Sequence, residues 1–296
     1  MARRLLSVLI AVVATVLGYL AAWTGGVATA MSANAFRGGF DPSGLPLVLL
    51  GLVLLAVAGL TIVMSSAGVI VVGAAHVLFG LLAFALPVTG ITGGFSPAYG
   101  LIRLLFSVSP SFADGLYFSV PTGFGMLVGV ALLVSGLMAR SRQAPTNSIA
   151  RVTTGLVALV LGVPGVLLVL TGGGSSYRRT AAMLQPATPL DVVLIASGVI
   201  LVAVVVASVR WSSTGVILLG AIVSVLGVVF LVASAQIFGT IVGISQEFAA
   251  GVQSAGATGN VLILGVVLLA VGFGVRVRAR RSVTLAPADV PDVASV

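Results

Sequence analysis

The sequence predicts an all-α integral membrane protein whose eight transmembrane helices form two parallel tandem four-helix repeats. Three observations predict this fold: very few charged residues, eight long apolar stretches, and an internal repeat at about half the chain length. The predicted arrangement has short cytoplasmic turns and longer extracytoplasmic loops that carry short interfacial helices.

Charged residues make up only 7% of the 296 residues, whereas 59% are hydrophobic. A soluble domain carries roughly 25% charged residues, so this composition is typical of a membrane protein. The net charge of +8 comes from 14 arginines, without any lysine. These arginines lie at the ends of the apolar stretches, which favours contact with anionic lipids of the inner leaflet and excludes nucleic acid as a partner. Arginine without lysine, together with abundant Ala, Val and Gly, is typical of a GC-rich bacterial genome.

Eight stretches reach the length of about 20 apolar residues that a helix needs to cross a bilayer. We expect each to be helical, because an isolated strand would leave its backbone polar groups unpaired in lipid. The stretches are residues 5–23, 45–64, 68–87, 120–139, 152–170, 190–209, 215–235 and 259–275. Two of the outer loops also carry amphipathic patterns, at 99–108 and 238–252, which predict helices at the membrane surface.

The distribution of arginines predicts the orientation. If the N-terminus lies in the cytoplasm, ten arginines fall on the inner side and four fall outside. The positive-inside rule then predicts a bacterial plasma-membrane protein with both termini in the cytoplasm. The outer connections, at roughly 20, 32, 19 and 23 residues, are longer than the inner ones, so we expect any recognition to occur outside. The four outer arginines are Arg37, Arg103, Arg178 and Arg179.

The first apolar stretch has a second interpretation. Arg3-Arg4, an apolar run and the triplet at 28–30 resemble a secretory signal peptide with a small-residue cleavage site. The run is long for such a peptide, and it has a counterpart inside the chain. We therefore expect a retained transmembrane helix.

The internal repeat is the strongest signal in the sequence. With a shift of 147 residues, the segments 4–26 and 151–173 share ten identities in 23 positions, and 65–80 matches 212–227 at half of its positions. With a shift of 136, the segment after Thr122 matches the segment after Thr258. A repeat of four helices begins and ends on one side of the membrane, so the two copies are predicted to be parallel. We expect repeats at 1–142 and 143–281, followed by a short disordered cytoplasmic tail at 282–296.

Glycines recur at a spacing of seven in four of the predicted helices, which places each pair on one stripe. We expect these stripes to pack helices within the chain; an oligomer interface is the alternative. The pairs are Gly73/Gly80, Gly129/Gly136, Gly220/Gly227 and Gly265/Gly272, and Gly125 adds a GxxxG to the second of them.

Five ionisable residues are candidates for function. His76 is the only histidine and lies in the third predicted span, where an ionisable group is expensive. Its counterpart in the second repeat is Val223, and helix packing is the alternative role. Arg103, Arg178 and Arg179 could hold an anionic lipid or phosphate outside, near Asp191, unless they belong to solvated loops.

The sequence contains none of the common hydrolase, metalloprotease or phosphate-loop motifs, and the absence of cysteine excludes thiol chemistry. We expect no catalytic site, no cofactor and no metal. The predicted function is a non-enzymatic scaffold or accessory subunit of the bacterial envelope, with a membrane-protein partner or self-association. The alternative is a transporter or flippase for a neutral or lipid-like molecule, for which Pro164 is the one candidate helix break.

Overall fold

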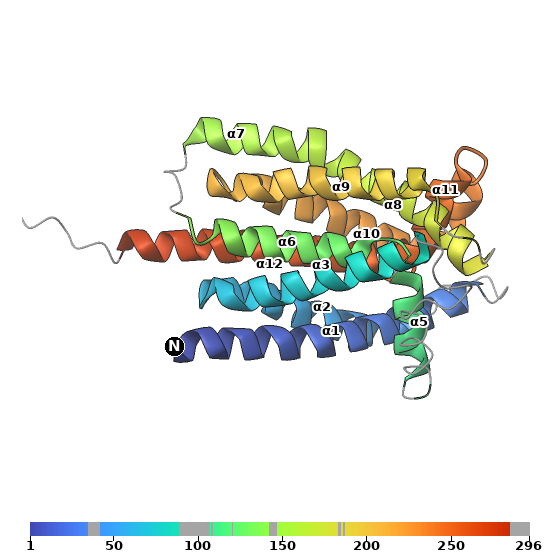
Figure 1. Cartoon of the computed structure of the whole chain (residues 1–296), viewed down its shortest axis with the longest axis horizontal. Coiled ribbons are helices and arrows are strands. Elements are labelled where there is room, and N and C mark those ends of the chain that lie inside the picture. The colour runs from blue at the N-terminus through green and yellow to red at the C-terminus, as the bar shows by residue number, and fades with distance from the viewer. Residues whose placement is uncertain are drawn as a thin grey trace, which may run out of the picture.

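The computed structural model describes residues 1–34, 42–88, 107, 109–119, 121–141, 147–182, 185 and 187–284. Within these ranges every regular element is helical, and the long helices run side by side in one bundle (Figure 1). The helices are α1 (Ala2–Asn34), α2 (Leu45–Leu60), α3 (Ser66–Val88), α5 (Pro110–Ser119), α6 (Phe124–Met138), α7 (Ser148–Val157), α8 (Val163–Tyr177), α9 (Pro189–Ala207), α10 (Thr214–Ile241), α11 (Gln246–Gly251) and α12 (Asn260–Thr284).

Six of the described helical segments are long and apolar enough to cross a bilayer. Helices α5 and α6 together make a seventh candidate, although they meet at an angle of 83°. The apolar part of α3 that passes the same test is shorter, at Ser66–Leu82. The structure therefore supports the prediction of a multi-pass helical membrane protein. The described residues contain six to seven long apolar helices, whereas the sequence predicts eight.

The bundle has two distinct ends (Figure 1). The N-terminus and the last turns of α12 lie at one end, and the short helices α5 and α11 lie at the other, which we call the capping end. Helix α11 falls inside the segment 238–252 for which an interfacial helix was predicted, but residues 238–241 instead continue α10 beyond a kink at Ala233. Helix α5 was not predicted, and almost all of the predicted helix at 99–108 lies outside the described residues.

Helices α6 and α12 each begin at a glycine with a left-handed backbone. Gly123 has φ of 73° and Gly259 has φ of 83°. A residue with a Cβ atom is strained in this region, whereas glycine enters it without cost. Each glycine therefore lets the chain turn from a short helix at the capping end into a long helix of the bundle.

The glycine stripes pack helices within the chain, as predicted. A Cβ atom at any of the eight paired glycines would come within 3.0 Å of a neighbouring helix. Gly73 lies against Gly129 and Leu133 of α6, and Gly220 lies against Gly265 and Leu269 of α12. Such close backbone approach is how apolar helices associate in lipid, where the hydrophobic effect between helices is absent.

The candidate break at Pro164 does not interrupt its helix. Helix α7, a π-helical turn at Ala158–Gly162 and helix α8 form one continuous candidate span, Ser148–Thr180. Proline lacks the N–H group that an α-helix needs, and its ring collides with the preceding turn. A π-helical turn just before the proline re-registers the backbone hydrogen bonds locally.

Candidate functional site

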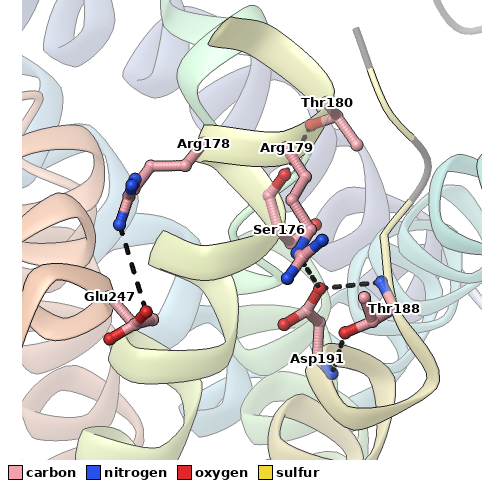
Figure 2. Close-up of polar contacts among 7 residues, drawn as sticks. All are labelled: Ser176, Arg178, Arg179, Thr180, Thr188, Asp191 and Glu247. Atoms are coloured by element: carbon pink, nitrogen blue, oxygen red, sulfur yellow. Dashed lines mark hydrogen bonds and ion pairs between the residues drawn. The ribbon is translucent and has the colours of Figure 1, made fainter. Parts of the chain in front are cut away.

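Three of the predicted site residues meet at the capping end (Figure 2). Arg178 and Arg179 follow the last turn of α8, and Asp191 lies in the first turn of α9. The Nε atom of Arg179 lies 3.7 Å from Oδ2 of Asp191. Nη1 of Arg178 lies 4.0 Å from Oε1 of Glu247 in α11. Arg103, the fourth predicted residue of this group, lies outside the described residues.

Asp191 is held chiefly by the start of its own helix. The backbone N–H of Thr188 donates to Oδ2 of Asp191 at 2.8 Å, and the N–H of Asp191 donates to the Thr188 hydroxyl at 3.3 Å. This reciprocal capping box satisfies two helix-terminal donors and contributes about 0.5–2 kcal/mol to stability. The Asp191 side chain is only 3% exposed.

The pair between Arg178 and Glu247 is weaker, because both side chains are substantially exposed and the charges are just in contact. Exposed pairs of this kind contribute about 0–1 kcal/mol. The pair nevertheless joins the end of α8 to α11, across 69 residues of sequence. Together the two ion pairs give Arg178 and Arg179 carboxylate partners, which an anionic ligand would have to displace.

His76 lies apart from this group, in the middle of α3. Its Nδ1 atom lies 2.9 Å from the carbonyl oxygen of Val72, one turn earlier. A carbonyl only accepts hydrogen bonds, so Nδ1 carries the proton and Nε2 of the neutral ring is an acceptor. The His76 ring contacts that of Tyr19, with ring centroids 5.3 Å apart. His76 therefore belongs to an aromatic group between α1 and α3.

A cavity of about 70 Å³ lies beside this aromatic group. Helices α1, α3, α5 and α6 form its walls. Its lining is almost entirely apolar and aromatic, and includes Tyr19, Trp23, His76, Leu116, Gly125 and Met126. An apolar cavity with a few polar groups is the usual form of a small-molecule binding site.

A buried polar network borders the cavity. The indole N–H of Trp23 donates to Oδ1 of Asn260 at 2.9 Å, and the Ser119 hydroxyl donates to the same oxygen at 3.0 Å. The Asn260 amide donates in turn to the Thr258 hydroxyl at 2.8 Å. This network connects α1 with α12, 237 residues later in the chain. This network was not predicted from the sequence. Asn260 follows Gly259 at the position that corresponds to Phe124 in the predicted first repeat, and a polar residue at the start of an apolar stretch was the signal that could have indicated it.

No group of three or more His, Cys, Asp or Glu side chains in the described part of the chain could hold a metal ion. Comparison of the chain with models of known protein families, with curated proteins and with solved structures finds no match.

Proposed function

We propose that this protein is a non-enzymatic scaffold or accessory subunit of the bacterial plasma membrane. It has eight transmembrane helices, arranged as two tandem four-helix units with both termini in the cytoplasm. The observation that carries the proposal is the contact between the two units, which is packed backbone against backbone in the described residues.

Matched contacts support the duplication. Gly51 lies against the carbonyl of Gly18 where α2 meets α1, and Gly198 lies against the carbonyl of Gly165 where α9 meets α8. These two pairs differ by 147 positions, which is the shift found in the sequence. The same shift relates the contact of Gly68 with Ser7 to that of Gly215 with Thr154.

Contacts between the units are reciprocal. Gly26 of the first unit lies against the backbone of Thr258 in the second, and Gly173 of the second lies against Thr122 of the first. Reciprocal contacts of this kind are expected when a two-fold axis relates two units, and here that axis runs along the bundle. Helices α6 and α12 pack against each other, and α12 is the most enclosed span, with 72% of its apolar window buried against 33–44% in the five others.

The charges support the orientation. Nine described arginines lie at the end of the bundle that carries the N-terminus and the last turns of α12, whereas Arg178 and Arg179 lie at the capping end. The positive-inside rule assigns the first end to the cytoplasm. The capping end, with α5 and α11, then faces the outside.

The tight packing of the interface between the two units favours a scaffold over an enzyme or a transporter. Parallel-repeat transporters hold their substrate between the repeats, near the bilayer midplane. In the described residues this interface is occupied by glycine-to-backbone contacts and buried aliphatic side chains such as Val271 and Ile195. Transport of a neutral or lipid-like molecule remains the second candidate, and the cavity beside His76 is the observation that favours it.

Co-purification tests the function. We expect the protein, isolated in lipid nanodiscs, to carry a membrane-protein partner in stoichiometric amount, identified by mass spectrometry. Ile244, an 85% exposed apolar residue at the capping end, is a candidate contact point. Ile244→Asp should therefore release most of the partner, whereas Ser148→Asp at the opposite end should retain it. The proposal would be overturned in favour of transport if the protein purified without a partner and liposomes that contain it took up or flipped a small molecule.

The topology has its own test, which uses the absence of native cysteine. We expect Ile244→Cys to react with a membrane-impermeant maleimide in intact cells. Ser148→Cys, also exposed but at the other end, should react only after the cells are permeabilised. Labelling of Ser148→Cys but not Ile244→Cys in intact cells would reverse the orientation.

A further inference from the structure

A residue that lines the cavity between α1, α3, α5 and α6 carries a buried hydroxyl without a hydrogen-bond partner among the described residues. Tyr19 lines the cavity and is 6% exposed, and its hydroxyl oxygen makes no hydrogen bond in the structure. A buried polar group left unpaired costs about 1–3 kcal/mol. Such a group beside an empty space points to a ligand that would complete it.

The corresponding place in the second unit is filled. Gly125 lines the cavity, and a Cβ atom there would meet nothing within 4 Å. Its counterpart at the 136-residue shift is Val261, which is fully buried. Three other cavity residues also have buried aliphatic counterparts: Val166 for Tyr19, Leu170 for Trp23 and Val223 for His76, each about 1% exposed. The second unit therefore packs aliphatic side chains at these four positions, so the aromatic cavity in the first unit is not a requirement of the architecture.

Exposed apolar residues of α3 border the cavity near the capping end. Phe79 and Gly80 of α3 lie in its wall, and the adjacent residues Leu78, Leu81 and Leu82 are 52–60% exposed. An exposed apolar surface on a membrane span contacts acyl chains. Gly125 and Met126 belong to the first turn of α6, which begins at the capping end. A molecule dissolved in the outer leaflet would therefore reach the cavity sideways, without crossing water.

The two polar groups of the aromatic wall select the chemistry of the ligand. The Tyr19 hydroxyl can donate a hydrogen bond, and Nε2 of His76 can accept one. An alcohol group, which accepts one bond and donates another, pairs with both. The remaining wall is aromatic and aliphatic, and suits hydrocarbon.

We propose that this cavity binds the hydroxyl end of a lipid-soluble alcohol from the outer leaflet. A volume of about 70 Å³ accommodates the hydroxyl and the first few carbon atoms, while the rest of the molecule lies along α3 among the lipids. This binding site goes beyond the proposed scaffold role, and its place in the outer leaflet rests on the proposed orientation.

Photo-crosslinking in nanodiscs tests the proposal. The probe is a long-chain fatty alcohol with a diazirine on the carbons next to the hydroxyl. We expect crosslinks on peptides of α1, α3 and α6, competed by the unlabelled alcohol but not by the alkane or methyl ether of equal length. Tyr19→Phe should weaken binding about three- to tenfold, since it removes one hydrogen bond. Gly125→Val, which copies the second unit, should reduce specific crosslinking at least tenfold.

Two matched variants separate loss of the site from loss of the fold. Thr15→Val removes another unpaired buried hydroxyl of α1 that does not line the cavity. Gly239→Val adds a side chain at an exposed helical glycine with nothing within 4 Å. Both should bind the probe as the wild type does. Crosslinks spread evenly over the lipid-facing surface, or unchanged in Gly125→Val, would overturn the proposal.

Discussion

Gly173→Val is expected to lower the free energy of unfolding by about 3 kcal/mol, the upper end of the usual cost of overpacking. Gly173 is buried in α8, and a Cβ atom there would overlap the backbone of Thr122 from the other unit. Backbone cannot swing aside as a flexible side chain can, so the two units must separate to admit the valine. In a thermal-shift assay in detergent this corresponds to a fall in Tm of roughly 5 °C.

Gly26→Val supplies the companion measurement. Gly26 makes the reciprocal contact, with the backbone of Thr258, so its substitution should cost about as much as that of Gly173. Gly239→Val is the control, because it changes helix propensity by less than about 1 kcal/mol and meets no neighbour. If Gly173→Val had the same Tm as Gly239→Val, the two units would not be joined through these glycines.

The features that sequence alone could predict are those set by composition and period. The length of an apolar stretch defines a transmembrane helix, and a glycine spacing of seven places the glycines on one stripe of that helix. Gly73 and Gly220 could therefore be assigned to helix packing from the sequence alone. Both signals are local, and they repeat in the two halves. The bundle and its close helix contacts follow from them.

The features that could not be predicted depend on contacts between distant segments. The turn before α6 requires a left-handed Gly123, and α5 lies across the bundle because Gly115 packs directly on the Trp23 side chain. The ion pair between Arg178 and Glu247 likewise joins segments that the sequence does not align. Aromatic residues near helix ends are typical of the membrane interface, so Trp23 and Tyr19 gave no sign that they are buried.

Differences between the two units carry more functional information than their similarities. The shared positions are mostly glycines and small residues, which are needed to pack either unit. The positions around the cavity differ: Tyr19 and His76 correspond to Val166 and Val223 at the 147-residue shift. Aliphatic residues are sufficient for packing at these positions, as the buried valines demonstrate. Polar aromatic residues in the first unit therefore indicate a task beyond packing.

Asn260→Leu is expected to destabilise the protein by about 2 kcal/mol, although leucine suits a membrane span better than asparagine does. Asn260 is 3% exposed and its Oδ1 atom accepts the indole N–H of Trp23, which is itself 7% exposed. Leucine would leave that N–H buried without a partner, at a cost of about 1–3 kcal/mol. Ser119 loses less, because its hydroxyl also lies 2.7 Å from the carbonyl of Gly115.

A double-mutant cycle with Trp23→Phe isolates this effect. Phenylalanine has no N–H group, so Asn260→Leu should cost less by about 1–2 kcal/mol in the Trp23→Phe background than in the wild type. Ser135→Ala is the control: its buried hydroxyl bonds only to the carbonyl of Ala131 in its own helix, so its loss should change stability by less than about 0.5 kcal/mol. Additive losses in the cycle would mean that the bond from Trp23 to Asn260 does not hold α1 to α12, and the contact between the units would then rest on the glycines alone.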